Sequence, residues 1–244
     1  MIKLGVNIDH VATLRQARYA RMPGAHNEEP CLLAAARECE AAGAHSITLH
    51  LREDRRHVQD RDVHLLRREL QVPLNLEMGN AAEIVEIACA VRPAYACLVP
   101  ENREEITTEG GLDVVTQRAA IAATTRRLQA GGTKVSLFID PVPDQVQAAA
   151  DIGADMIELH TGAYANATPH DRAAELHRLI AAGRQGHTLG LQINAGHGIT
   201  VDNLPPLKAI PHLIELNIGH HLISRAITIG LRAAVAEMLV AMRA

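Results

Sequence analysis

Short runs of β-favouring residues recur eight times along the 244 residues of this chain, and they constrain its fold more than any other feature. Between most of them lie stretches rich in Ala, Leu and Arg with helical spacing, such as 31–42 and 144–152. Strand alternating with helix eight times in a chain of this length is typical of a (β/α)8 barrel. We therefore predict a TIM barrel with extra helices, formed as a single domain over residues 1–244. The expected strands are 3–9, 45–51, 73–78, 95–100, 134–140, 155–161, 189–195 and 213–219.

A doubly wound open sheet is the rival architecture. It usually carries a G-x-G-x-x-G fingerprint after its first strand, and this sequence has none there. Two pairs of similar sequence segments are also consistent with repeated strand–helix units. "AGAHSITLH" (42–50) resembles "IGADMIELH" (152–160), and "NAGH" (194–197) resembles "NIGH" (217–220).

Composition excludes several classes of protein. The net charge is −4, no long basic run is present, and one Phe, three Tyr and no Trp offer little for base stacking, so we expect no nucleic-acid partner. None of the four cysteines sits in a C-x-x-C pair, and free thiols suit a reducing cytosol. The start "MIKLGVNIDH" is too short and polar for a signal peptide, and no apolar run is long enough to span a bilayer. We expect a soluble, cytoplasmic protein without a membrane partner.

The faces of the predicted strands that point into the barrel are unusually polar. Barrel interiors are mostly filled by branched apolar side chains, and a buried polar group without a partner costs about 1–3 kcal/mol. A ring of such groups therefore indicates a paired network, a ligand, or both. The inward set comprises Asn7, Asp9, Thr48, His50, Asn75, Glu77, Ser136, Asp140, Glu158, His160, Gln192, Asn194, Glu215 and Asn217.

Four ionisable residues fall at or just past the ends of four different strands: His50, Glu77, Glu158 and His197. Singly, a strand-end His or Glu often only caps a loop. Together they lie on the barrel face where enzymes of this fold keep their chemistry. Imidazoles beside carboxylates in a partly buried pocket suit general acid–base work, so we predict that these four are catalytic.

Two anion sites are expected at the same rim. Loops after strands seven and eight often bind phosphate in this fold, which places one site near Gly198, Gly219 and His220. A second anion could be held by Arg18, Arg52 and His57, because guanidinium forks match phosphate geometry. The neighbouring Arg55, Arg56 and Arg61 are assigned to a solvated helix face, and the Thr-Thr and Gly-Gly pairs of 105–114 fit a mobile lid.

Lysine and histidine positions bear on two rival chemistries. A Schiff-base aldolase needs a lysine inside the barrel, but two of the three lysines begin strands and the third lies in a connecting helix: Lys3, Lys134 and Lys208. A divalent metal is the other rival, with Glu158 and four histidines as ligands: His50, His160, His197 and His220. No local metal spacing such as H-E-x-x-H is present, so no metal is predicted.

Long motifs in one order along the chain resemble the pyridoxine 5′-phosphate synthase family of vitamin B6 biosynthesis. They are "GVNIDHVATLRQAR", "ITLHLREDRRH", "NLEM", "CLVPE", "TTEGGLDV", "VSLFID", "IELHTG", "NAGHG" and "ELNIGH". The resemblance runs from the first strand to the last helix. One departure is 19–30, "YARMPGAHNEEP", which is longer than the family's usual first connection.

The resemblance implies a transferase that condenses 3-amino-2-oxopropyl phosphate with 1-deoxy-D-xylulose 5-phosphate to give pyridoxine 5′-phosphate, phosphate and water. It implies that His50 and Glu77 act as bases, His197 as an acid and Glu158 as a transition-state stabiliser. It further implies no metal or organic cofactor, and a homo-oligomer of eight chains. The implied ligands of the amino-ketone phosphate are Asn7, Arg18, Gly198, Gly219 and His220, and those of the deoxyxylulose phosphate are Asp9, His10, Arg52, His57 and Thr107.

Two other functions stay open on the residues alone. The protein could be a metal-dependent epimerase or aldolase acting on a sugar phosphate, which metal analysis would detect. It could also be a barrel that binds a phosphorylated metabolite without turning it over.

Overall fold

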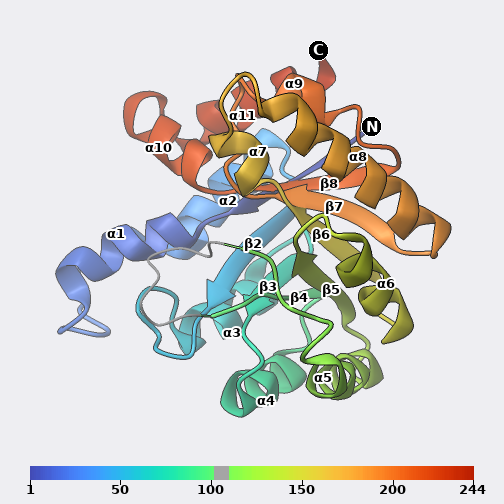
Figure 1. The fold of residues 1–244 in the computed structure, drawn as a ribbon. Helices are drawn as coiled ribbons and strands as arrows, with labels where there is room; N and C mark the ends of the chain where they lie inside the picture. The colour runs from blue at the N-terminus through green and yellow to red at the C-terminus, as the bar shows by residue number, and fades with distance from the viewer. Residues whose placement is uncertain (102–109) are drawn as a thin grey trace.

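The computed structural model describes residues 1–101 and 110–244 and shows a closed barrel of eight parallel strands wrapped by helices (Figure 1). Each strand pairs with its neighbours in the sequence, and β1 pairs with β8 to close the barrel. The predicted (β/α)8 fold is confirmed. The strands are β1 (Lys3–Asn7), β2 (Ser46–Leu51), β3 (Leu74–Met78), β4 (Tyr95–Leu98), β5 (Lys134–Ile139), β6 (Met156–His160), β7 (Gln192–Gly196) and β8 (Leu213–Ile218).

Helices cover the outside of the barrel, and the two expected from their spacing over 31–42 and 144–152 are present as α2 and α6. Gly43, in the left-handed conformation at φ +100°, ends α2, and Pro143 begins α6. The helices are α1 (Asp9–Tyr19), α2 (Leu32–Ala42), α3 (Asp60–Glu69), α4 (Ala82–Val91), α5 (Arg118–Ala130), α6 (Pro143–Asp151), α7 (Gly162–Asn166), α8 (Arg172–Thr188), α9 (Leu204–Leu207), α10 (His220–Ile229) and α11 (Leu231–Arg243).

Period-two alternation along the strands sorts their side chains between two faces. Leu49 and Leu76 point outward and are fully buried against the helices, and each such burial stabilises the fold by about 1.5–3 kcal/mol. On the other face Thr48 is aligned with Asn75 across the β2–β3 pair, and His50 with Glu77. In β2 and β3 the apolar face therefore holds the helices and the polar face points into the barrel.

Much of the polar interior forms a hydrogen-bonded network, which is one of the two arrangements that its composition indicates, although Asn75 Oδ1 and Ser136 Oγ have no partner among the described residues. Asn217 of β8 is central, because its amide donates to Glu158 Oε2 at 2.6 Å and its Oδ1 accepts from the Thr48 hydroxyl at 3.3 Å. Further links join Ser46 to Glu215 at 2.9 Å and Asn75 to Thr48 at 3.4 Å. These pairings offset the desolvation of groups that are nearly all shielded from solvent.

The predicted strand ends differ from the observed ones by up to three residues, and two of the differences have a clear cause. The strand expected over 189–195 is shifted, because α8 runs to Thr188 and Gly190 turns the chain at φ +86° before β7 begins at Gln192. The first strand ends at Asn7, whose Oδ1 accepts the Asp9 N–H at 2.9 Å in a turn that starts α1. Asp9 is therefore a first-turn helix residue rather than an inward strand residue, although it still faces the barrel mouth.

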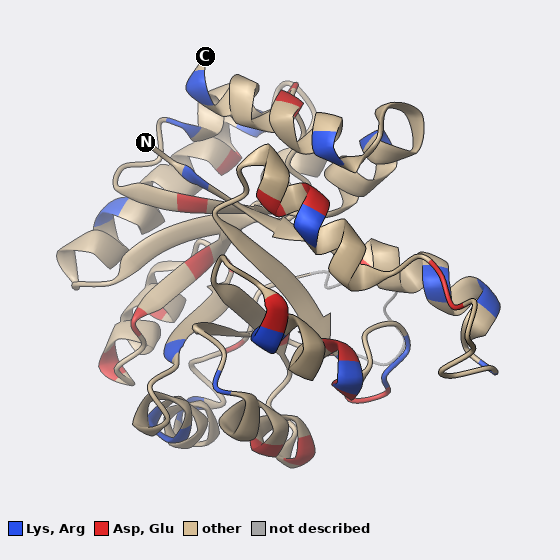
Figure 2. Ribbon diagram, turned by 180° about the vertical axis from the view of Figure 1, so that it is seen from behind, with Lys and Arg blue, Asp and Glu red and all other residues tan. Residues whose placement is uncertain are grey.

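The rim of the barrel is extended by α1 and α10, which lie against each other at one side of the molecule (Figure 1). Seen from behind, Lys and Arg are interspersed with Asp and Glu over the outer helices (Figure 2). Within the part of the chain that the structure describes, no helix combines the length and apolar character needed to cross a bilayer.

Candidate active site

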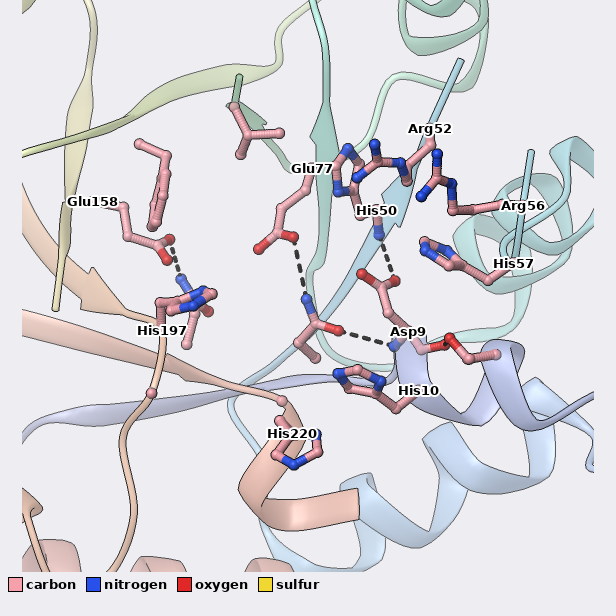
Figure 3. Close-up of a pocket in the computed structure, with 17 residues that line it drawn as sticks. Asp9, His10, His50, Arg52, Arg56, His57, Glu77, Glu158, His197 and His220 are labelled. Carbon is pink, nitrogen blue, oxygen red and sulfur yellow. Dashed lines mark hydrogen bonds between the residues drawn. The ribbon is translucent and has the colours of Figure 1, made fainter. Parts of the chain in front are cut away.

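A cavity of about 580 Å³ opens at the carboxyl ends of the strands, and every strand end contributes to its wall (Figure 3). It is much larger than a single side chain and fits the usual size range of small-molecule sites. The lining residues are Asn7, Asp9, His10, Thr13, His50, Arg52, Arg56, His57, Glu77, Val99, Phe138, Glu158, His197, Gly198, Asn217, Gly219 and His220.

Twelve of the fourteen site residues predicted from the sequence line this one cavity. Arg18 does not: it is exposed in the last turn of α1, with its guanidinium carbon 5.7 Å from the centre of the Tyr19 ring. Thr107 lies outside the described residues. The same is true of most of the predicted lid over 105–114; its described end packs on the barrel, where the Leu112 N–H donates to the Phe138 carbonyl at 2.7 Å.

The loop after β2 corrects one assignment. Arg56 was assigned to a solvated helix face, but 52–57 is not helical and Arg56 lines the cavity. Its guanidinium is held by Asp54 Oδ2 at 2.6 Å. Arg55, at φ +50°, instead donates to Asp60 and Glu83. These two adjacent arginines therefore point in different directions and have different partners.

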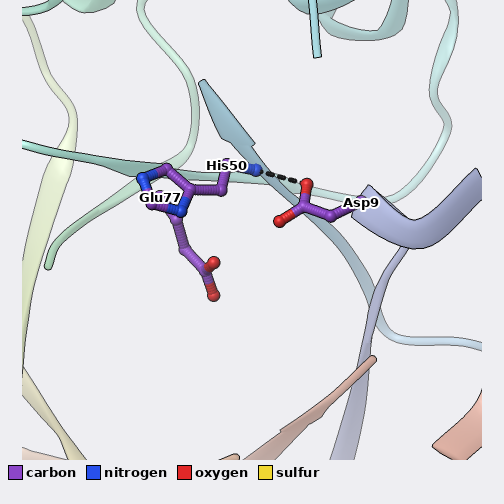
Figure 4. A group of neighbouring side chains, drawn as sticks. All are labelled: Asp9, His50 and Glu77. Atoms are coloured by element: carbon purple, nitrogen blue, oxygen red, sulfur yellow. Dashed lines mark hydrogen bonds between the residues drawn. The ribbon is translucent and has the colours of Figure 1, made fainter. Parts of the chain in front are cut away.

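Asp9, His50 and Glu77 line the cavity and lie close together (Figure 4). The backbone N–H of His50 donates to Asp9 Oδ1 at 2.7 Å. The Asn7 amide donates to Glu77 Oε2 at 3.2 Å, so Asn7 holds both carboxyl residues in place. One side-chain nitrogen or oxygen from each member of the trio lies within 4.8 Å of the others.

Burial sets the protonation of the carboxyls in this cavity. Desolvation raises the pKa of Asp9 to about 6, although the nearby His50 partly opposes it. Desolvation also raises the pKa of Glu77 well above its usual range, and the charges of Asp9 and Glu158 add to the effect. The pKa of Glu158 is raised to about 7, again by burial, against the hydrogen bond from Asn217. These three carboxyls therefore keep protons to a higher pH than exposed carboxyls do.

The histidines show the complementary effect. Burial lowers the pKa of His197 to about 4, and the neighbouring His160 ring, 5.1 Å away between centres, lowers it further. Burial likewise lowers the pKa of His57 to about 4, with smaller contributions from His50 and Arg52. Because both imidazoles are neutral at pH 7, an arriving anion would favour their protonation. The cavity thus has groups that can take up a proton when a phosphate binds.

His197 also has an unusual backbone. Its φ is +81°, a left-handed conformation that is rare outside glycine and clusters at functional sites. The preceding Gly196 brings the chain against Glu158, where a Cβ would lie 2.3 Å from Oε1. The "NAGHG" loop is therefore shaped to place an imidazole next to a buried carboxyl.

Two ends of the cavity are suited to anions. At one, Gly219 precedes α10, whose first N–H groups have no partner within the helix, and Gly198 lies across from it on the loop after β7. At the other, Arg52, Arg56 and His57 gather on the loop after β2 (Figure 3). Glu77 lies between these two ends.

A divalent ion could be held by Asp9, His50 and Glu77, which carry suitable hard and imidazole ligands. Within the described residues, the larger set considered from the sequence, Glu158 with four histidines, does not converge in this way. Protons compete with a metal for Asp9 and Glu77, because burial favours their neutral forms. All three lysines lie away from the cavity, as predicted.

A closed (β/α)8 barrel with acids and bases at the carboxyl face of its strands, between two ends suited to anions, has the architecture of a barrel enzyme. Comparison with known sequences narrows this class. The chain belongs to the family described as pyridoxal phosphate biosynthesis protein PdxJ, whose sequence model matches residues 4–244.

Curated relatives named pyridoxine 5′-phosphate synthase are similar over nearly their whole length. The Akkermansia muciniphila protein is 56% identical over 96% of both chains, and the Synechococcus protein is 55% identical over 99% of both. The Coxiella burnetii protein is 52% identical over 98% of this chain and 97% of its own. The resemblance to this family drawn from the motifs is thereby confirmed.

Solved structures with low sequence identity share the fold alone. A 4-hydroxy-2-oxoglutarate aldolase/2-deydro-3-deoxyphosphogluconate aldolase from TTHB1 has a TM-score of 0.60 at 19% identity, covering 88% of this chain and 89% of its own. A phosphoribosyl anthranilate isomerase from Thermus thermophilus has a TM-score of 0.56 at 15% identity, covering 98% and 99%.

Several site residues were not singled out from the sequence. Thr13 lies one helical turn after Asp9 on α1, and Val99 and Phe138 supply an apolar wall. Phe138 is the only Phe of the chain and lies between Ser136 and Asp140, so strand alternation could have identified it. Glu101, which contacts His50 from behind the cavity wall, ends the motif "CLVPE".

Proposed function

We propose that this chain is a pyridoxine 5′-phosphate synthase. It condenses 3-amino-2-oxopropyl phosphate with 1-deoxy-D-xylulose 5-phosphate, releasing pyridoxine 5′-phosphate, phosphate and water. The observation that carries the proposal is the pair of separate anion ends flanking one cluster of acids and bases. A reaction that joins two phosphorylated molecules needs both ends in one cavity. The name shared by relatives 52–56% identical to this chain supports it.

The amino-ketone phosphate would occupy the end formed by Gly198, Gly219 and His220. There the N-terminus of α10 offers N–H groups to a phosphate. Asn7, whose side chain adjoins Gly219, would contact the rest of this substrate. Arg18, on α1, would reach this end only by moving from its place over Tyr19.

The deoxyxylulose phosphate would bind at the opposite end, where Arg52 and His57 face the cavity. Asp9 and His10 would hold its hydroxyl groups, and Thr107 is proposed to contact it as well. Arg56 joins this set, because it lines the same end of the cavity.

Between the two ends, His50 and Glu77 act as bases, His197 as an acid and Glu158 as a stabiliser of developing positive charge. Glu77 holds its proton before substrate binds, because burial raises its pKa. A substrate ammonium or iminium beside it would favour the carboxylate and release a base where it is needed. A substrate phosphate would in turn favour the imidazolium form of His197.

The imine forms between the two substrates, so the enzyme needs no lysine in the cavity and uses no metal or organic cofactor. The whole chain acts as one domain. We further propose a cytoplasmic homo-octamer. Free cysteines support a reducing compartment, and the exposed apolar side chains of Leu14, Ile227 and Val240 on α1, α10 and α11 support contacts between copies.

The test is to incubate the purified protein with both substrates and to follow pyridoxine 5′-phosphate and inorganic phosphate together. We expect the two products to form in equal amounts, and only when both substrates are present. Native mass spectrometry of the same sample should give eight chains. Absence of the ring product from folded protein that binds both substrates would overturn the proposal.

A further inference from the structure

Glu101 lies three residues past the end of β4 and is not part of the cavity lining. Its carboxylate nevertheless contacts the cavity through His50: Glu101 Oε1 is 2.9 Å from His50 Nε2. The same carboxylate accepts the backbone N–H of Gly79 at 2.9 Å and that of Glu53 at 3.1 Å. Only 15% of the Glu101 side chain and 6% of the His50 side chain are exposed, so solvent competes little with this contact.

The hydrogen bonds around Glu101 determine its charge. Burial alone would raise the pKa of Glu101, but the contact with His50 and the two backbone donors outweigh burial and lower the pKa below its ordinary value. Glu101 is therefore ionised at neutral pH, and an ionised carboxylate can only accept hydrogen bonds. The proton between Glu101 and His50 must then sit on Nε2.

We propose that Glu101 is a positioning residue that keeps a proton on His50 Nε2, so that Nδ1 carries the lone pair with which His50 accepts a proton from substrate. The two nitrogens of a neutral imidazole have opposite roles, and the partner of one nitrogen fixes the role of the other. When His50 takes up the proton, it becomes an imidazolium whose charge the Glu101 carboxylate stabilises. This inference rests on the proposed function, because that function makes His50 a base.

The neighbourhood of Gly79 offers a second way to disturb the contact. A Cβ at Gly79 would lie 2.8 Å from the Glu101 carboxyl carbon. Gly79 is not in the left-handed region, so alanine is compatible with its backbone. Gly79→Ala should therefore displace the Glu101 carboxylate from His50 without changing its chemistry.

The test compares Glu101→Gln, Gly79→Ala, His50→Asn and the double variant of Glu101 and His50 in single turnovers with both substrates. General-base loss in His50→Asn should slow ring formation roughly 100- to 10,000-fold. Glu101→Gln should slow it roughly 10- to 100-fold, with little change in apparent substrate affinity and a shifted pH–rate profile. In the His50→Asn background, Glu101→Gln should cause no further loss, because it acts through the imidazole. Glu86→Gln, at an exposed ion pair with Arg127, is the matched control and should behave as wild type.

Nitrogen NMR of labelled histidine provides a readout independent of turnover. The wild-type enzyme should show His50 protonated on Nε2, and both Glu101→Gln and Gly79→Ala should reduce that preference. Wild-type turnover in Glu101→Gln alongside an inactive His50→Asn, or a proton on Nδ1 in the wild type, would overturn the positioning role alone. Full activity of His50→Asn would instead overturn the proposed role of His50. Should Glu101→Gln fail to fold, the wild-type NMR spectrum and Gly79→Ala still decide the question.

Discussion

Replacing Glu158 by Gln should stabilise the fold at neutral and alkaline pH but not at acidic pH. Glu158 is 3% exposed, and burial raises its pKa from 4.5 to about 7. Gln has nearly the shape of a protonated Glu, and its carbonyl oxygen can still accept the hydrogen bond from Asn217. The substitution therefore changes the charge of the site with little change in its packing.

The direction of this change in stability follows from proton binding to Glu158 in the folded and unfolded chains. As pH rises through 4.5, the unfolded chain loses the Glu158 proton while the folded chain keeps it, so folding becomes progressively less favourable until about pH 7. The difference between the two pKa values corresponds to about 3 kcal/mol, at 1.36 kcal/mol for each pH unit. The Gln variant does not experience this loss. Its free energy of unfolding relative to wild type should therefore rise by about 3 kcal/mol between pH 4 and pH 8.

The measurement is urea unfolding of both proteins at several pH values, with the exposed Glu86→Gln variant as a control that should show no such trend. Most of the difference should develop between pH 5 and pH 7. A stability difference that stays constant over this range would show that Glu158 is already ionised in the folded protein. Burial would then not raise the pKa of Glu158 in the folded protein.

Four further outcomes are expected at the same site. Arg52→Ala should weaken the apparent affinity for the deoxyxylulose phosphate roughly 10- to 150-fold, since one charge-assisted contact is worth about 1.5–3 kcal/mol; an unchanged affinity would contradict its assignment. Glu77→Gln should lower single-turnover ring formation by about 100- to 10,000-fold while thermal unfolding and substrate binding stay near wild type, and a retained tenth of the rate would remove Glu77 from the catalytic set. Exhaustive chelation should leave activity intact; loss that one divalent metal restores would instead favour a metal bound by Asp9, His50 and Glu77. Because burial lowers the pKa of His57 and of His197 to about 4, calorimetry in buffers of different ionisation enthalpy should show proton uptake on phosphate binding near pH 6, and no uptake would count against their protonation.

The barrel could be predicted because its determinants are periodic and repeated. Alternation within each strand places residues such as Thr48 and Glu158 inside, and eight repeats leave few other architectures. Strand ends such as His50 and Glu77 were predicted to meet because the fold brings all carboxyl ends together. Periodicity and topology are enough to predict that these residues point inward, without information on any single contact.

Positions in the loops depend on contacts between distant residues and were not predictable in this way. Asp9 was taken for a strand residue because nothing in its own run reveals the turn formed with Asn7. Arg56 was misassigned because the left-handed backbone at Arg55 sends the two arginines to different partners. Glu101 contacts His50 across 51 positions of sequence, and only the folded barrel brings them together.

Closure of the barrel by β1 and β8 affects how the protein acquires activity during synthesis. Lys3 is aligned with Glu215 across this seam, and Asn7 lies against Gly219, so the amino-terminal wall of the cavity is completed by the last barrel strand to leave the ribosome. Until then β1 has one open edge, and contacts of such long sequence separation form slowly. We therefore expect the nascent chain to lack a complete cavity, and to be exposed to mispairing, until β8 has emerged. A pause in translation before residue 213 would prolong this vulnerable period, whereas a pause after β8 would not.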